Sequence, residues 1–351
     1  MRPPNEEQAL QQVAERLAEL MDFAAVEAEI QRPRGHDRPD AVIDVSGRTF
    51  VVEWKSTGAA APVALSAEQV RVFAESLGRD AIPLVAVPFM GHVGRQKCDE
   101  AGVGWLDLSG NAGISAPGIR ILVEGQPNRF KRRGRPSSAF APKSARIARW
   151  LLLDPHRPMT QREIAQATDM DEGFTSRIVS KLEEDGLIIR QEDGAIAVGD
   201  PNLLLDAWRE EYDFSKHRIL RGHAPARSGE ALLGQLSERL DEEGLRYAAT
   251  GLAAAWKMTR FAGFRIVTVY LSEGPGRTVL GSLGFREGPQ GSNLWLVMPN
   301  DQGVFHGASD QAGVRCVHPV QVYLDLFAHP ERSKEAAEEL RTEYLNWRVD
   351  A

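Results

Sequence analysis

The chain has few cysteines, no long apolar run and no excess of basic residues. Its 351 residues include two cysteines, Cys98 and Cys316, which excludes a disulfide framework or a four-cysteine zinc site and fits a reducing cytoplasm. No apolar run approaches the ~20 residues that span a bilayer. The first residues, MRPPNEEQALQQ, lack the basic and apolar segments of a secretory signal. We therefore expect a cytoplasmic protein that has no membrane partner.

The charge balance is acidic, with 49 acidic and 42 basic residues and a net charge of −7. A protein that simply coats nucleic acid is usually basic. Any contact with DNA must therefore come from local basic patches on an acidic body. The eight histidines form no metal-ligand spacing such as HExxH or HxH, and the sequence has no Walker loop.

Hydrophobic patterning divides the chain into blocks of different character. A length of 351 residues suits two or three domains. The first block, 1–125, alternates helical and strand patterns, which predicts an α/β domain around a mixed sheet. A basic linker over 126–142 leads into a helical block over 143–215. The last block, 228–351, mixes helices with strands over 264–271 and 293–298. The helices and strands predicted in the first block span 6–23, 40–45, 49–54, 66–78, 82–90, 94–103, 104–109 and 119–125.

Residues 144–200 have the pattern of three helices followed by a hairpin. Thr160 and Glu163 have the spacing of a capping box, and Asp171 can cap the third helix. Gly186 provides a C-terminal stop for that helix. The runs LIIR and AIAV can then pair across a short turn as a wing. Together these features predict a winged helix-turn-helix.

The third helix of this block has one apolar stripe and one polar face. Phe174, Ile178 and Leu182 recur at four-residue spacing, and we expect all of them to be buried. At 100° per residue the small and cationic side chains lie away from the stripe or at its edge, where they can enter a major groove about 12 Å wide. The residues predicted to contact DNA from this helix are Ser176, Arg177, Ser180 and Lys181.

This block resembles MarR-like and related winged-helix regulators over about sixty residues. The resemblance implies binding to double-stranded DNA. Winged helices also serve as protein–protein modules, and the acidic residues Glu192 and Asp193 at the wing tip would be repelled by phosphate. A protein-interaction scaffold with no DNA role is therefore an open alternative.

The linker before the winged helix is strongly basic. A run of cations without any acid begins in this linker and continues into the helical block, and it consists of Arg129, Lys131, Arg132, Arg133, Arg135, Lys143, Arg146 and Arg149. The sequence RGRP over 133–136 resembles the core of an AT-hook, in which Arg133 and Arg135 would lie in a narrow A·T minor groove. The alternative is a basic linker that is only solvated.

A second candidate site lies in the first block. If residues 46–47 form a two-residue hairpin turn, Asp40 faces Glu53 directly, with their Cβ atoms roughly 5 Å apart. Glu53 and Lys55 share this face because side chains alternate along a strand, and Trp54 points to the opposite, packed side. Two carboxylates and one ammonium group are therefore expected to converge at the end of the hairpin.

These residues resemble the PD-(D/E)xK motif of restriction-endonuclease-like nucleases and Holliday-junction resolvases. Their context of helix, hairpin, helix and apolar strand matches that nuclease core over about eighty residues. Such a site would hold Mg²⁺ through Asp40 and Glu53. Lys55 would position the attacking water or stabilise the developing negative charge. Short patterns of this kind also occur by chance, and nuclease-like folds can persist as binding modules.

Several other polar residues are weaker candidates for this site. Asp44 is an alternative ligand on the face of Asp40, and Gln69 lies on the helix that follows the hairpin. Glu15 or Glu19 on the first helix would add an outer carboxylate. In the stretch 104–111, Asp107 and Asn111 could line the edge of the site, but we interpret them as turn residues at the end of a strand.

Segments of the last block resemble AbiEi-type antitoxins of type IV toxin–antitoxin systems. These segments are 247–255, 320–326 and the stretch that begins at Glu331, and with the winged helix the resemblance covers about 200 residues. It implies a C-terminal α/β domain of nucleotidyltransferase-like fold and a transcriptional autorepressor that counters a toxin protein. The paired carboxylates of an active nucleotidyltransferase are missing, since only Glu273 lies near the expected strand. We therefore expect no nucleotide transfer, and we interpret 250–255 as a small-residue helix start packed close to a neighbour and 321–326 as a core helix.

The leading prediction is an α/β multidomain protein with a restriction-endonuclease-like mixed sheet, a winged helix-turn-helix and a nucleotidyltransferase-like C-terminal domain. It would bind double-stranded DNA as a regulator or as a defence-associated antitoxin with a cognate toxin as partner. A homodimer would suit a two-fold DNA site. The alternative function is a Mg²⁺-dependent DNA endonuclease that the winged helix targets.

Overall fold

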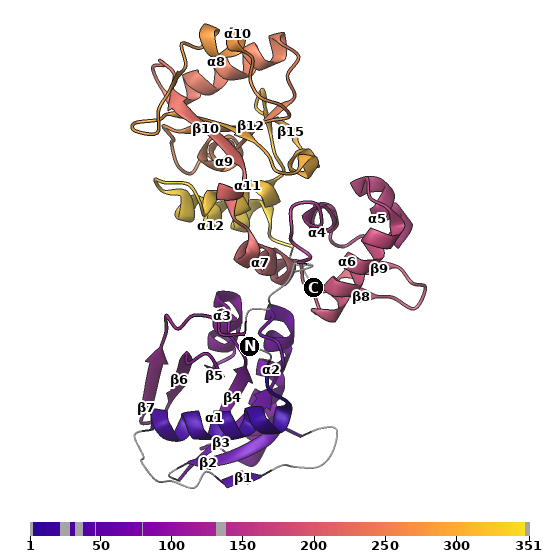
Figure 1. The fold of residues 1–351 in the computed structure, drawn as a ribbon, viewed down its shortest axis with the longest axis vertical. Coiled ribbons are helices and arrows are strands. Elements are labelled where there is room, and N and C mark those ends of the chain that lie inside the picture. The colour runs from indigo at the N-terminus through magenta and orange to yellow at the C-terminus, as the bar shows by residue number, and fades with distance from the viewer. Residues whose placement is uncertain are drawn as a thin grey trace. The chain divides into compact units, whose positions relative to one another are not determined.

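The computed structural model of the chain describes residues 3–21, 29–31, 38–45, 47–78, 80–130 and 138–347. Contacts divide the chain into two compact units, residues 1–137 with 183–187 and residues 138–182 with 188–351. Each unit contains a seven-stranded mixed sheet, and a separate two-stranded hairpin completes the set of sheets (Figure 1). No helix within the described ranges is long and apolar enough to cross a membrane.

The sheet of the first unit follows the order of the chain, from β1 to β7. β2 and β3 form an antiparallel hairpin, β3, β4 and β5 are parallel, and β6 and β7 are antiparallel to their neighbours. The helices α2 and α3 make the two parallel connections. The elements are α1 (Glu6–Leu20), β1 (Glu29–Gln31), β2 (Ala41–Val45), β3 (Arg48–Trp54), α2 (Ala60–Leu77), β4 (Ile82–Val87), α3 (His92–Glu100), β5 (Gly104–Asp107), β6 (Ala112–Ala116) and β7 (Ile119–Val123).

This sheet separates two apolar cores. The buried face of α1 packs on one side, where Phe50, Val52 and Trp54 point from β3. The helices α2 and α3 cover the other side, where Val51 points from the same strand. Because side chains alternate along a strand, Glu53 shares the face of Val51. The candidate carboxylate site therefore lies on the side of the sheet that α2 and α3 cover.

Two strands of this unit, β1 and β6, were not predicted, and α2 begins six residues earlier than its predicted start at residue 66. Apart from Ile114, residues 112–116 of β6 are small and include Gly113, and small residues have low strand propensity. They form a strand because they pair with β5 and β7. α2 can begin at Ala60 because Pro62 falls in its first turn, where a missing N–H removes no helical hydrogen bond.

The second unit begins with the predicted winged helix. The elements are α4 (Ala145–Leu153), α5 (Gln161–Thr168), α6 (Glu172–Glu184), β8 (Ile188–Arg190) and β9 (Ile196–Val198). The capping box is confirmed, since the Thr160 hydroxyl accepts from the Glu163 N–H at 3.2 Å and the Glu163 carboxylate accepts from the Thr160 N–H at 2.7 Å. Asp171 caps α6 by accepting from the Phe174 N–H at 2.7 Å, and Gly186 follows the helix with φ of 69°.

The C-terminal part of this unit is a mixed α/β fold with strand order β13-β10-β14-β12-β11-β16-β15. The predicted core helix over 321–326 is confirmed as part of α11. The predicted close approach at the helix start is also confirmed, because a Cβ on Gly251 would lie 2.7 Å from His329 Nε2. The elements are α7 (Pro201–Glu211), η1 (Phe214–Lys216), β10 (Arg218–His223), α8 (Gly229–Glu242), β11 (Tyr247–Thr250), α9 (Gly251–Thr259), β12 (Val267–Leu271), α10 (Arg277–Ser282), β13 (Arg286–Glu287), β14 (Leu294–Met298), η2 (Gln302–Phe305), β15 (Ser309–Gln311), β16 (Val314–Cys316), α11 (Pro319–Leu326) and α12 (Ser333–Tyr344).

A buried carboxylate organises the polar interior of this part. Asp325 is fully buried and accepts hydrogen bonds from Tyr212 at 2.5 Å, Thr250 at 2.5 Å, Gln321 at 2.8 Å and Tyr270 at 3.0 Å. Burial raises the pKa of Asp325 to about 6, although these four donors oppose the shift. The four donors come from separate segments, so the carboxylate ties the sheet, α11 and the segment after α7 together.

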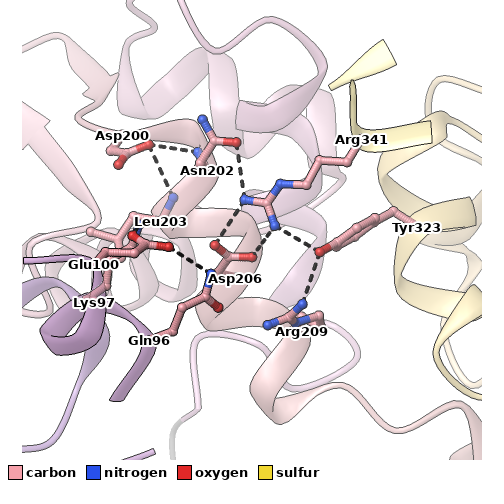
Figure 2. Close-up of polar contacts among 10 residues, drawn as sticks. All are labelled: Gln96, Lys97, Glu100, Asp200, Asn202, Leu203, Asp206, Arg209, Tyr323 and Arg341. Atoms are coloured by element: carbon pink, nitrogen blue, oxygen red, sulfur yellow. Dashed lines mark hydrogen bonds and ion pairs between the residues drawn. The ribbon is translucent and has the colours of Figure 1, made fainter. Parts of the chain in front are cut away.

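A second polar cluster ties α12 to α7 and α11 (Figure 2). Arg341 on α12 binds both carboxylate oxygens of Asp206 on α7, at 2.6 and 3.0 Å. It also donates to the hydroxyl of Tyr323 on α11 at 2.9 Å and to the Asn202 side chain at 3.2 Å. Such two-pronged pairing fixes orientation as well as distance, and it anchors the C-terminal helix.

Two arginines of the predicted basic run bind partners within the second unit. Arg146 on α4 forms an ion pair with Asp301, with N···O distances of 2.7 and 2.8 Å. Arg149 is 3% exposed, donates to Gln321 at 2.5 Å and lies over the ring of Trp208. Arg146 and Arg149 belong to the basic run by sequence, but they add little to any exposed basic surface, because partners distant in sequence bind them.

Candidate nucleic-acid interface and carboxylate site

The orientation of α6 differs from the predicted one. Its buried residues are Thr175, Ile178, Val179 and Leu182, whereas Phe174 is only half-buried. At 100° per residue this shifts the centre of the buried face by about 50° from the predicted stripe. A polar residue can join the buried face because the Thr175 hydroxyl donates to the Asp171 carbonyl at 3.0 Å. The prediction that Phe174 is fully buried was therefore wrong.

The face of α6 opposite its buried residues carries the residues predicted to contact DNA. Arg177 and Ser180 are exposed, and Ser176 and Lys181 are half-buried. The structure thus brings these four residues to one side of a helix whose other side is held in the core of the winged helix. Their contact with DNA stays a prediction.

Cations gather around Phe174 at the N-terminal end of this face. The Arg177 guanidinium carbon lies 5.6 Å from the ring centroid, and the Lys143 ammonium nitrogen lies 5.5 Å from it. Both distances are within the range of cation–π attraction. Lys143 precedes α4, so its place beside α6 depends on tertiary packing. The spacing of Phe174 and Arg177 would have suggested their contact, because residues three apart are neighbours on a helix.

The tip of the wing is acidic. Glu192 and Asp193 are exposed at the wing tip, where they disfavour close phosphate contact. The residues Arg133 and Arg135, which resemble part of an AT-hook, lie outside the described residues. The positive charge that the structure places at the N-terminal end of α6 comes from Arg177 and Lys143.

The predicted hairpin register in the first unit is confirmed. β2 and β3 pair Ala41 with Val52, so the next pair outward is Asp40 with Glu53. The Trp54 N–H donates to the Asp40 carboxylate at 2.8 Å, which holds Asp40 against the end of β3. Trp54 itself is 6% exposed in the core beneath α1, as predicted. Asp40 and Glu53 therefore lie side by side at the end of the hairpin.

Glu53 is a buried carboxylate with one oxygen unpaired. The residue is 6% exposed, and its Oε1 accepts from the Lys55 ammonium group at 2.7 Å. Its Oε2 is buried and has no hydrogen-bond partner among the described residues. Burial raises the pKa of Glu53 and the charge of Asp40 adds to this, whereas Lys55 opposes it. A cation at Oε2 would satisfy the unpaired oxygen.

The weaker candidates for this site have other surroundings. Asp44 accepts from the Thr49 hydroxyl at 2.5 Å, and Gln69 is exposed on α2. The interpretation of Asp107 and Asn111 as turn residues is confirmed, because the Asp107 carboxylate accepts from the Asn111 N–H at 3.0 Å and from its side chain at 2.8 Å. The other two candidates are exposed on α1, which packs on the opposite face of the sheet, and they are Glu15 and Glu19. In the described part of the chain no three His, Cys, Asp or Glu residues group as a metal site.

Two family models match adjacent parts of the chain after residue 140. Residues 141–195 match the MarR family, and residues 197–346 match a family described as a transcriptional regulator, the AbiEi antitoxin of a type IV toxin–antitoxin system. No curated protein and no solved structure gives a match to the chain. The first match covers the three helices of the winged helix, and the second begins in the wing and continues through α12. The chain thus carries a MarR-type winged helix followed by an AbiEi antitoxin domain, which supports a DNA-binding transcriptional regulator or antitoxin of a type IV toxin–antitoxin system.

Proposed function

We propose that the winged helix binds duplex DNA by placing the exposed face of α6 in the major groove. The observation that carries this proposal is the position of Arg177 and Ser180, which are exposed on a helix whose opposite side is packed in the core. Residues at the start of a recognition helix reach the base edges, and an arginine can bind guanine or phosphate. The overall charge of −7 makes such local cations the source of affinity.

Fluorescence anisotropy with the DNA upstream of the protein's own gene tests this proposal. Arg177→Ala is expected to weaken binding about tenfold, and to reduce the slope of log K against log[salt] by about one if Arg177 contacts phosphate. The matched control is Arg239→Ala, which removes a cation that is 50% exposed on α8 and pairs with Glu242. Equal affinities for wild type and Arg177→Ala would contradict the proposal.

We further propose that the protein represses its own operon and that the AbiEi domain binds a cognate toxin. The family description supports both roles. A reporter driven by the upstream DNA should be repressed by the wild type and released by Arg177→Ala. The neighbouring gene product, co-expressed with the chain, should co-purify with it and with a fragment that begins at Ser138. Repression without any co-purification would support the regulator and contradict the toxin partner.

The carboxylate site favours a second function, Mg²⁺-dependent cleavage of DNA. The buried, unpaired Oε2 of Glu53 beside Asp40 is the specific observation. Mg²⁺ in nucleic-acid enzymes is commonly held by one or two carboxylates together with waters and phosphate, so this donor set fits. Asp40 and Glu53 would hold the ion, which supplies charge stabilisation and an acidified water when bound. Lys55, 31% exposed, would neutralise charge that develops on the phosphate.

Plasmid nicking in the presence of Mg²⁺ tests the second function. The wild type should nick, and Glu53→Gln and Lys55→Met should not. Glu68→Gln is the control, because Glu68 is an exposed carboxylate of the same unit that also pairs with a cation. Mg²⁺ should also raise the melting temperature of the wild type and of the control but not of Glu53→Gln. Absence of both the nicking and the thermal shift would contradict the carboxylate site.

A further inference from the structure

The half-exposed aromatic ring of Phe174 stands out on α6. It is the third residue of the helix and lies at the boundary between the buried face and the polar face. The surrounding exposed positions are small or charged, with Gly173 before it and Arg177 one turn later. Residues at the N-terminal end of a recognition helix are the ones that approach base edges most closely. An apolar side chain at this place is therefore available to the groove floor.

The two cations beside Phe174 favour binding of an anionic partner at this place. Lys143 and Arg177 lie 5.5 and 5.6 Å from the ring centroid and come from different parts of the winged helix. Within the described part of the chain neither cation forms an ion pair, although the exposed acids Asp171 and Glu172 precede Phe174 in the sequence. An apolar ring flanked by two cations without ion pairs suits a surface that presents hydrophobic groups between phosphates. The major groove of DNA has this character where it contains thymine, because thymine projects a 5-methyl group.

We propose that Phe174 determines sequence specificity by packing against a thymine 5-methyl group, while Arg177 and Lys143 bind the adjacent base edge or phosphates. The inference rests on the proposed binding of DNA by α6 and adds a base preference to it. Arginine binds guanine through two hydrogen bonds, whereas an aromatic ring gains most from a methyl group. The bound half-site should therefore contain a thymine whose methyl group can be removed without changing base pairing.

Replacing thymine with uracil removes only that methyl group. A duplex is first selected from a random-sequence library with the wild-type chain, and a copy is then made by amplification with dUTP in place of dTTP. The wild type should bind the uracil copy about fourfold more weakly for each contacted methyl, which corresponds to ~0.8 kcal/mol. Phe174→Ala should bind both copies equally. Phe261→Ala is the control, because Phe261 is 38% exposed and has the cation of Arg332 over its ring at 5.1 Å.

The outcomes separate this inference from the proposed function. Equal binding of the two copies by the wild type, or a thymine preference retained in Phe174→Ala, would overturn the role of Phe174 while DNA binding stands. Failure of the wild type to select any duplex would overturn the proposed function and this inference with it. Thermal unfolding of Phe174→Ala checks its fold. If that variant unfolds, Phe174→Leu replaces it and should show a smaller thymine preference than the wild type.

Discussion

Replacing Arg146 should loosen the attachment of the winged helix to the AbiEi domain. Arg146 lies on α4 and Asp301 lies just before η2, so their ion pair links the two parts that the MarR and AbiEi families match. The guanidinium also donates to the Thr168 carbonyl at the end of α5 at 3.2 Å. One side chain thus connects two helices of the winged helix to a loop of the next domain.

The expected magnitude follows from geometry and burial. The pair makes two hydrogen bonds of 2.7 and 2.8 Å, and its side chains are 16% and 10% exposed. Exposed ion pairs contribute ~0–1 kcal/mol, whereas removing one partner of a buried pair costs about 3–5 kcal/mol. Because some solvent still reaches this pair, we expect Arg146→Met to cost about 3 kcal/mol and the coupling energy of the pair to be about 2 kcal/mol.

Urea unfolding of Arg146→Met, Asp301→Ala and the double variant measures this coupling. The control cycle uses Arg239 and Glu242, whose side chains are 50% and 62% exposed, and its coupling should stay below about 1 kcal/mol. The transition of the second unit should move while that of the first unit does not. A coupling energy for Arg146 and Asp301 no larger than in the control would refute the reasoning that this pair holds the two parts together.

Two further predictions concern stability. Burial lowers the pKa of His217 and of His329 from 6.5 to about 4. The contribution of their neutral imidazoles to the free energy of unfolding is therefore present above pH 6.5. It is lost as the pH falls towards 4, by up to about 3 kcal/mol for each residue. The pKa of Asp325 is raised from 3.8 to about 6, so its contribution is present below pH 3.8 and is lost as the pH rises to 6. Thermal unfolding should therefore show a lower melting temperature at pH 4 than at pH 7. The fall should be steeper in Asp325→Asn, which lacks the opposing contribution of the carboxyl group. A melting temperature that does not change with pH in either protein would contradict both the histidine and the Asp325 predictions. Gly113→Ala places a Cβ 2.5 Å from the Trp105 ring and should cost the first unit about 1–3 kcal/mol, and an unchanged melting temperature would contradict this packing.

Local features of the fold could be predicted from the sequence. The capping box of Thr160 and Glu163 depends on four consecutive residues, and the pairing of Asp40 with Glu53 depends on the turn and on alternation along two strands. Both are confirmed because the forces that decide them act over a few residues. The unpaired, buried state of Glu53 Oε2 could not be predicted, because it depends on how the helices cover the sheet.

Features decided by distant contacts were missed. Arg146 and Arg149 belong to a basic run by sequence, yet their partners Asp301 and Gln321 are 155 and 172 residues away. The orientation of α6 was also missed, since a polar residue, Thr175, joins its buried face through a hydrogen bond to the backbone. An analysis of apolar periodicity treats such a residue as exposed. For this reason the ring of Phe174 was predicted to be buried, although it is half-exposed.

Site-specific photocrosslinking from α6 tests the central claim most directly. A photoreactive amino acid replaces Ser180 on the exposed face of α6 or, as the control, Gln235, which is exposed on α8. With a duplex that the wild type selects, the chain should crosslink to DNA from position 180 and not from position 235. A chain that retains its DNA affinity but gives no crosslink from position 180 would contradict binding through this face.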